Sequence, residues 1–195
     1  MTEETAAYTP AKRQRLRQIL FEKCFRHSSE AVFPLSSGVM SNYYIDCKMA
    51  FSYPEARALV GELILERIGN TSVDAVGGMA IGAYPIGIAV SDAAYVHSGR
   101  VIRAFVVRKG TKGHGLKKNI EGDVRSGDKI LVVDDVITSG NSTIEAIARI
   151  REEGLEVVHS IALIDRQESG GRKNIESAGV PFESLFTLQD LKALI

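Results

Sequence analysis

The stretch "ILVVDDVITSGNST", residues 130–143, decides the fold, because an apolar run ends at two adjacent acids and a polar turn follows. The run is rich in β-branched residues and lacks polar alternation, which is typical of a strand buried on both faces of a parallel sheet. Ligands of such sheets bind outside the carboxyl ends of the strands. Asp134 and Asp135 are therefore candidate site residues.

The turn after the acids has the composition of an anion-binding segment. Free backbone N–H groups at a helix N-terminus attract anions, hydroxyls add donors, and glycine permits close approach of the backbone. The two acids would repel phosphate alone, but a ribose 5-phosphate offers hydroxyls to the acids and phosphate to the turn. The expected phosphate-binding residues are Val136, Ile137, Thr138, Ser139, Gly140, Asn141 and Ser142, with the Thr143 hydroxyl as a further donor.

Similar apolar runs alternate with helical segments in the rest of the chain. Buried strands are expected at 73–76, 101–107, 129–133, 156–164 and 182–186, and helices at 81–94 and 141–153. This alternation predicts an α/β fold with a mostly parallel central sheet, right-handed crossovers and flanking helices. A segment rich in glycine and lysine at 108–122 is expected to be a long loop.

Two amphipathic helices are expected before the first of these strands. A Thr-Pro pair at 9–10 has the pattern of an N-cap and first helical residue, and the apolar stripe reaches residue 24. A Ser-x-x-Glu capping box at 52–55 opens the second helix, which a glycine ends at residue 69. Between the two helices, residues 32–48 predict a hairpin-like excursion.

Composition limits the kind of protein. With 195 residues, 45% of them hydrophobic, the chain is expected to form one domain, 1–195, with an N-terminal helix and small hood at 1–50 and an α/β core at 70–195. Equal counts of 24 basic and 24 acidic residues argue against a nucleic-acid or membrane partner. The polar start and the glycine-interrupted apolar run at 75–90 predict a cytoplasmic protein. Cys24 and Cys47 lack a C-x-x-C pairing and are expected to be reduced, buried thiols.

Other phosphate-related motifs fit less well. A Walker A loop requires lysine after its last glycine, whereas Gly140 precedes Asn141, and the G-x-G-x-x-G spacing is absent. A receiver domain also opens with such a strand, but only 60 residues follow Asp135. An ordinary helix cap beside two surface acids explains each residue singly but not their combination.

The segment "VVDDVITSGNST" resembles the signature of the type I phosphoribosyltransferases, which use 5-phosphoribosyl 1-diphosphate and magnesium. Three further segments, at 33–46, 107–115 and 163–171, resemble the branch of that family that uses orotate. The resemblance implies transfer of ribose 5-phosphate to orotate, with diphosphate as the leaving group. It also implies that Mg²⁺ is held mainly by the substrate, with no protein ligand assigned directly.

The resemblance implies a cationic lid that covers the active site of the neighbouring subunit in a homodimer. Flexible cationic segments suit stabilisation of a diphosphate leaving group. The lid residues implied to bind the diphosphate substrate are Arg108, Lys109, Lys112 and His114; the residues implied to act in catalysis are Lys109, Lys112, His114, Asp134 and Asp135.

Orotate contacts are also implied by the resemblance, at Ser37, Gly38, Tyr44, Thr138 and Arg166. A planar guanidinium suits bidentate contact with a carbonyl or carboxylate. The chain departs from many relatives at Ser36 and near Gly82, where those relatives have lysines, and Lys48 is the candidate replacement for one of them. Two alternatives stay open, a phosphoribosyltransferase for another base and a non-enzymatic regulator with this fold.

Overall fold

A six-stranded sheet in the order β10-β9-β8-β5-β6-β7 lies at the centre of the computed structural model, which describes residues 3–34, 38, 40–110 and 119–195. The strands are β5 (Ala75–Met79), β6 (Arg103–Val107), β7 (Ile120–Glu121), β8 (Lys129–Ile137), β9 (Glu156–Asp165) and β10 (Phe182–Thr187). All pairings among β5, β6, β8, β9 and β10 are parallel, and short β7 pairs antiparallel with β6. The predicted α/β class with a mostly parallel sheet is confirmed.

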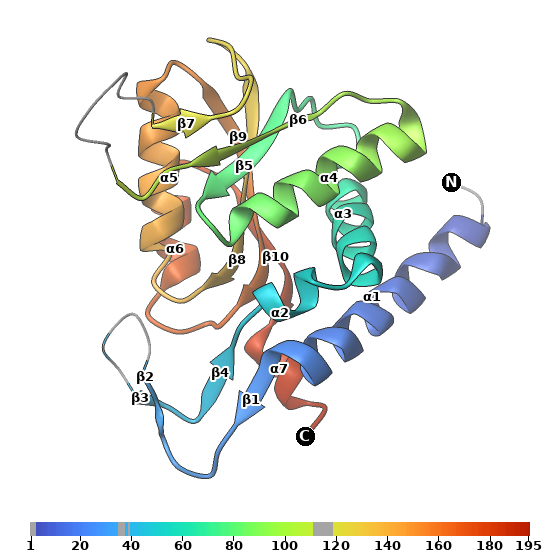
Figure 1. Cartoon of the computed structure of the whole chain (residues 1–195), viewed down its shortest axis with the longest axis vertical. Helices are drawn as coiled ribbons and strands as arrows, with labels where there is room; N and C mark the ends of the chain where they lie inside the picture. The colour runs from blue at the N-terminus through green and yellow to red at the C-terminus, as the bar shows by residue number, and fades with distance from the viewer. Residues whose placement is uncertain (1–2, 35–37, 39, 111–118) are drawn as a thin grey trace.

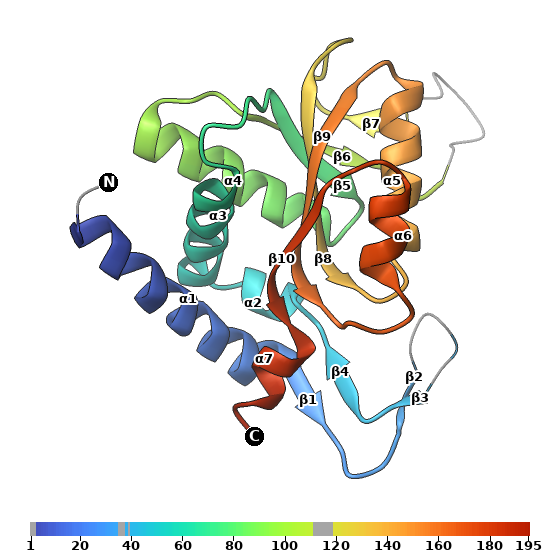
Figure 2. The ribbon, with the colours of Figure 1, turned by 180° about the vertical axis from the view of Figure 1, so that it is seen from behind.

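Helices cover both faces of the sheet (Figures 1 and 2). One face carries α4 (Ala83–Ser98), with α3 (Pro54–Ile68) packed on it and α1 (Glu3–Cys24) outside α3. The other face carries α5 (Asn141–Glu152) and α6 (Gly171–Ser177). Two short helices complete the chain, α2 (Lys48–Phe51) before α3 and α7 (Leu188–Lys192) at the end. Each face of the sheet therefore borders its own apolar cluster.

Strand β8 shows how the sequence builds this arrangement. Successive side chains of a strand point to opposite faces of the sheet. Leu131 and Val133 join the cluster under α4, whereas Ile130 and Val132 join the cluster under α5. All four are fully buried, so the expectation of a strand buried on both faces is confirmed.

The order of the strands creates a switch point between β5 and β8. From β5 the chain crosses through α4 to β6 on one side, and from β8 it crosses through α5 to β9 on the other side. Right-handed crossovers in opposite directions put the two helices on opposite faces. Crevices at the carboxyl ends of strands at such a point bind ligands, so the fold directs attention to the ends of β5 and β8.

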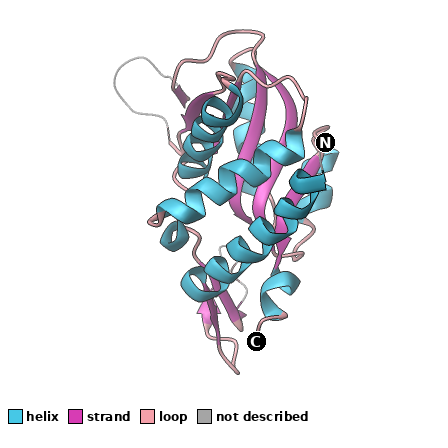
Figure 3. Cartoon of the chain, turned by 90° about the vertical axis from the view of Figure 1, so that its right-hand side faces the viewer, coloured by secondary structure: helices cyan, strands magenta, loops and turns pink. Residues whose placement is uncertain are grey.

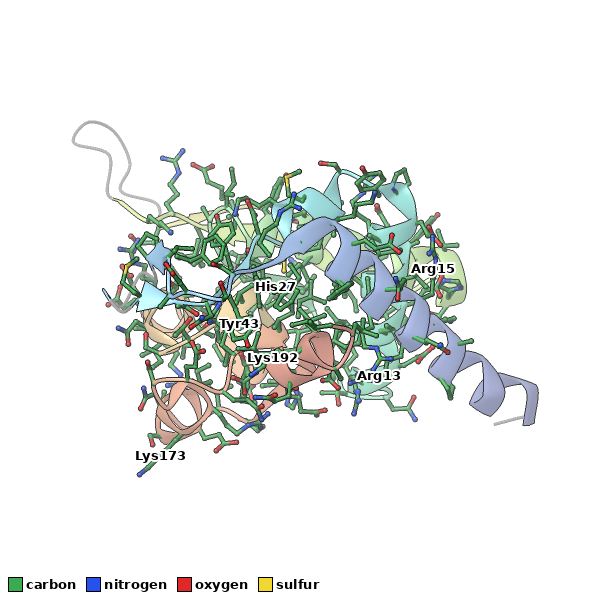
Figure 4. All side chains as sticks on the ribbon, turned by 90° about the horizontal axis from the view of Figure 1, so that it is seen from below. Arg13, Arg15, His27, Tyr43, Lys173 and Lys192 are labelled. Carbon is green, nitrogen blue, oxygen red and sulfur yellow. The ribbon has the colours of Figure 1, made fainter. Side chains whose placement is uncertain are left out.

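A hood of two antiparallel strand pairs lies beyond the carboxyl ends of the sheet, at one end of the molecule (Figures 1 and 3). In it β1 (Phe25–His27) pairs with β4 (Tyr43–Ile45), and β2 (Phe33–Pro34) pairs with β3 (Met40–Ser41). The Tyr43 ring stacks on Phe25 at 5.8 Å, and the Lys192 ammonium of α7 lies 4.7 Å from the same ring (Figure 4). The hood is thus tied to the carboxyl-terminal helix.

Several expected helix boundaries were wrong. Helix α1 begins at Glu3 rather than behind Thr9, and Pro10 lies inside it, because the preceding alanines and glutamates favour helix. The capping box at 52–55 does not form. Pro54 takes the first helical position instead, a site where its missing N–H costs nothing, and Ser52 ends α2.

Of the remaining expectations, some are confirmed and one boundary is shifted. Gly69 ends α3 as predicted, and α4 runs over 83–98 rather than 81–94. The expected hairpin-like excursion corresponds to the hood. Cys24 and Cys47 are free and buried. Within the described residues, no helix combines the length and apolar character needed to cross a membrane.

Candidate active site

The two acids of β8 point in opposite directions, as strand alternation requires. Asp134 faces α5, where the Thr143 hydroxyl donates to its Oδ2 at 2.7 Å and the backbone N–H of Asp135 donates to its Oδ1 at 3.0 Å. Asp134 is 8% exposed. Burial, and then the negative charge of Asp135, raise its pKa to about 7, while the bond from Thr143 opposes the rise. The fold therefore favours the protonated form of the Asp134 carboxyl more than water does.

Asp135 faces the start of α4. Gly82 is the N-cap of that helix, and a Cβ added there would lie 2.5 Å from the Asp135 carboxyl carbon. Any side chain at position 82 would displace the carboxylate. The glycine thus gives Asp135 its place at the mouth of the switch point.

A polar pocket of about 230 Å³ opens between these acids and the end of β5. Its walls come from the β5–α4 connection, the end of β8, the start of α5, and two lysines from distant parts of the chain. The lining residues are Lys48, Met79, Ala80, Ile81, Gly82, Lys109, Asp134, Asp135, Val136 and Ser142. The switch point therefore carries a pocket that is lined by two carboxylates and two lysines.

The turn after β8 is shorter than expected. Val136 and Ile137 still pair with β9, so they are the last residues of β8, and Val136 also lines the pocket. The strand continues because β9 extends to Asp165 and offers a partner. Thr138 to Gly140 form the turn, and α5 begins at Asn141.

Gly140 has φ of +76°, a conformation that favours glycine. The turn rests on α6, because the Asn174 side chain donates to the Ser139 carbonyl at 2.9 Å. Gly171 packs so closely on the Thr138 carbonyl that a Cβ there would overlap it. The N–H groups of the first turn of a helix have no partner inside the helix, so α5 presents free donors beside the pocket.

The base of the 108–122 loop is held in place. The Arg108 N–H donates to the Asn119 carbonyl at 2.9 Å, its guanidinium pairs with Glu121 at 2.6 Å, and Arg149 donates to its carbonyl. Arg108 is not among the residues that line the pocket, whereas Lys109 lines the pocket of its own chain. Lys112 and His114 lie outside the described residues.

Arg166 directly follows β9 and is almost fully buried. Its Nε donates to Glu168 Oε2 at 2.8 Å and its Nη2 to Ser41 Oγ at 3.0 Å, and the Tyr43 carbonyl lies at 3.3 Å from Nη1. The guanidinium thus joins β9 to the hood. Sequence reasoning did not identify Ser41 and Glu168 as its partners.

The other described residues that were expected to contact orotate lie at separate places. Tyr44 is partly exposed in the hood and stacks on Phe33 at 5.8 Å. Gly38 is exposed, with φ of +82°. Ser36 and Ser37 lie outside the described residues. The structure therefore brings together the acids, Ser142 and Lys109 in one pocket, and places Arg166 and Tyr44 in and against the hood.

Comparison with known proteins first defines the class. The model of the phosphoribosyl transferase domain family matches residues 51–184, from the end of α2 to β10. This range contains both acids, the turn and the switch point. The chain therefore contains a phosphoribosyl transferase domain, and its fold is the fold of that class.

Individual relatives narrow the class. The orotate phosphoribosyltransferase of Aquifex aeolicus is 41% identical over 180 residues, which cover 92% of this chain and 97% of that protein. The orotate phosphoribosyltransferase of Mycobacterium tuberculosis, in complex with 5-phospho-α-D-ribosyl 1-diphosphate, is 31% identical with a TM-score of 0.74, over 93% of this chain and 92% of that one. The chain belongs to the orotate phosphoribosyltransferase family.

The fold extends further than this family. Adenine phosphoribosyltransferase of Rhodothermus marinus is similar with a TM-score of 0.61 and 24% identity, over 90% of this chain and 99% of that one. At this identity the likeness concerns the fold alone.

Proposed function

We propose that the chain transfers the ribose 5-phosphate group of 5-phosphoribosyl 1-diphosphate to orotate, which gives orotidine 5′-monophosphate and diphosphate in the de novo synthesis of UMP. The observation that carries the proposal is the pocket at the switch point, which is lined by two carboxylates, two lysines and Ser142 from the first turn of α5. The activity carried in the names of the relatives described above supports the choice of orotate.

The 5-phosphate, the ribose hydroxyls and the diphosphate of the ribosyl donor suit different parts of the site. The turn from Thr138 to Ser142 offers N–H and hydroxyl donors for the 5-phosphate. Asp134 and Asp135 accept hydrogen bonds from ribose hydroxyls, which are neutral and so escape the repulsion that a phosphate would meet. Lys109 is assigned to the diphosphate, with Arg108, Lys112 and His114 as further contacts implied by the resemblance.

The reaction is a displacement at ribose C1. The bond from C1 to the diphosphate oxygen breaks, its electrons leave with the diphosphate, and N1 of orotate forms the new bond to C1 as it loses its proton. The transition state has oxocarbenium character and requires no covalent intermediate. The contribution of the protein is positioning, together with charge placed where the leaving group becomes negative.

Magnesium fits the donors of this pocket. Carboxylate oxygens are ligands that Mg²⁺ accepts, and it is usually bound through substrate phosphates together with one or two carboxylates. Asp134 and Asp135 are the residues that would help to hold it, with the substrate as its main ligand. When bound, the ion would neutralise charge on the diphosphate.

We assign Arg166 to the base, with Tyr44, Gly38, Ser37 and Thr138 as the other implied contacts. The fork of the guanidinium already meets the Glu168 carboxylate. A substrate carboxylate would therefore have to replace Glu168, or use the guanidinium N–H that remains.

We propose a homodimer with a lid shared between subunits, and exposed apolar side chains support the dimer. Large exposed apolar patches mark interaction surfaces. On and beside α2, α3 and α4 these are Met49, Tyr53, Ile81, Tyr84, Ile88, Tyr95, Val96 and Val101. A mainly apolar groove of about 340 Å³ between α3 and α4 lies among them. A second copy of the chain would bury this surface.

We also infer a cytoplasmic location, which the two free buried thiols support.

The phosphate assignment predicts the effect of Thr138→Ala. The substitution removes one hydrogen bond to a charged group, of about 1.5–3 kcal/mol, and should weaken binding of 5-phosphoribosyl 1-diphosphate roughly 10- to 100-fold. Calorimetric titration without orotate measures this, and Thr138→Ser, which keeps the hydroxyl, is the matched control. A folded alanine variant with unchanged affinity would contradict the assignment.

The activity itself is tested with a panel of bases. Orotate, uracil, hypoxanthine, guanine and adenine are each supplied with 5-phosphoribosyl 1-diphosphate and Mg²⁺, and nucleotide formation is measured. Of these five bases, we expect only orotate to be converted to its nucleotide. Turnover with a purine instead would favour the alternative of another base, and ligand binding with zero turnover for every base would favour a regulator.

A further inference from the structure

Lys48 is a cation with a defined place at the edge of the pocket. It is the first residue of α2, directly after the hood. Its ammonium pairs with Asp46 at 2.7 Å, and its backbone N–H donates to the same carboxylate at 3.1 Å. The Lys48 side chain is 54% exposed, whereas that of Asp46 is 23% exposed. The lysine therefore has room to move, while the aspartate that holds it is the more fixed partner.

The pocket gives this lysine something to bind. Lys48 and Lys109 both line it, one from the hood side and the other from the base of the 108–122 loop. Among the described residues that form its lining, they are the two cations. The two acids of β8 line the same pocket, and Asp135 lies close enough to Lys48 for its charge to raise the pKa of the lysine. A ligand with an anionic end and a hydroxyl-bearing end can therefore use both kinds of side chain.

The stretch from Met79 to Gly82 lines the pocket and carries no charge, and position 82 has no space for a side chain while Asp135 keeps its place. Positive charge in the lining therefore comes from other elements. Lys48 stays charged there, because its bond to Asp46, and then the charges of Asp46 and Asp135, raise its pKa.

We propose that Lys48 binds the diphosphate of 5-phosphoribosyl 1-diphosphate together with Lys109, and that Asp46 holds its ammonium in readiness while the pocket is empty. The proposal rests on the proposed function and adds a substrate-binding residue to it. An exposed lysine–aspartate pair stabilises a fold very little. The ammonium can therefore leave Asp46 for a diphosphate, which carries more charge, at small cost to the fold.

The test compares Lys48→Met with Lys129→Met. Lys129 is at the amino end of β8, the opposite end of the strand from the pocket, and its loss changes the net charge equally. Lys48→Met should raise KM for 5-phosphoribosyl 1-diphosphate, and in the reverse reaction KM for diphosphate, roughly 10-fold or more. KM for orotate and for orotidine 5′-monophosphate should stay within about twofold, a change of under half a kcal/mol. Lys129→Met should behave as wild type.

Asp46→Asn separates ligand binding from a structural role. Asparagine still accepts the backbone N–H of Lys48 but no longer competes for its ammonium. Affinity for diphosphate should therefore stay equal or rise in Asp46→Asn and fall in Lys48→Met. Equal losses in both variants would mean that the pair only shapes the hood, and would overturn the proposal. An effect of Lys48→Met on orotate alone would overturn it as well, since the cation would then serve the base.

Direct binding keeps this result separate from the proposed function. Calorimetric titration with inorganic diphosphate requires neither orotate nor turnover. If the wild-type protein binds diphosphate, Lys48→Met binds it at least 10-fold more weakly, and orotate is not converted, Lys48 keeps its role and the proposed function fails. If orotate is converted and Lys48→Met binds diphosphate as well as wild type does, the proposed function stands and the role of Lys48 is refuted.

Discussion

Mixing equal amounts of inactive Asp135→Asn and Lys112→Ala homodimers should restore about a quarter of wild-type activity if the lid is shared between subunits. Half of the exchanged dimers are then heterodimers. In each of these, one site receives both defects and the other site receives neither. The activity is measured with orotate after subunit exchange, which mass spectrometry follows through the mass difference between the variants.

Lys109 supplies the matched control for this experiment. It lines the pocket that contains Asp135 of its own chain, so Asp135→Asn and Lys109→Ala in one heterodimer leave a defect in each site. That mixture should recover nothing. If the mixture with Lys112→Ala also recovers nothing after exchange is complete, Lys112 serves its own subunit and the shared lid is refuted.

Asp134→Asn should lower turnover by roughly 10²-fold or more and at the same time stabilise the free protein at alkaline pH. The loss of turnover follows from the loss of a carboxylate that is proposed to hold the ribose hydroxyls as charge develops on the ring. Turnover with orotate at saturating substrate measures it. The Thr143 hydroxyl that donates to Asp134 can donate to the amide oxygen of asparagine as well, so the substitution keeps this contact with α5.

The effect on stability follows from linkage. The pKa of Asp134 is about 7 in the folded protein and about 3.9 in the unfolded chain. The folded state therefore binds the extra proton between these values, and the free energy of unfolding contributed by Asp134 is full below pH 4 and is lost as pH rises through 7. Asparagine has no such loss. The Tm of Asp134→Asn should exceed that of wild type at pH 8, and this advantage should shrink towards pH 4. An advantage that is constant from pH 4 to pH 8 would show that burial of the charge is not its cause.

The parts of the fold that could be predicted are those that depend on the pattern of neighbouring residues in the sequence. Four β-branched and apolar residues from Ile130 to Val133 are sufficient to place a strand buried on both faces, because each face of that strand needs apolar cover. Helix ends were less predictable, since two local signals competed at 52–55 and the proline prevailed over the capping box. The length of β8 depended on β9, a partner that the local sequence does not reveal.

The site, too, has residues that the sequence predicts and contacts that it does not. Asp134, Asp135, Ser142 and Lys109 were found from the sequence and share one pocket. The surroundings of Arg166 could not be found this way, because Ser41 and Tyr43 are more than 120 residues earlier in the chain and meet it only through the packing of the hood. The closeness of Gly82 to Asp135 is equally a product of the sheet order, which places the ends of β5 and β8 side by side.

The opposite orientation of the two acids gives each of them its own control. Asp134 accepts a hydrogen bond from Thr143 of α5, whereas the Asp135 carboxylate occupies the space next to Gly82 at the start of α4. A substitution of Thr143 can therefore alter the proton affinity of Asp134 while Asp135 keeps its position, and a side chain at position 82 can move Asp135 while Asp134 keeps its bond to Thr143. Two neighbouring residues of identical chemistry can thus be altered separately, each through the helix that it faces.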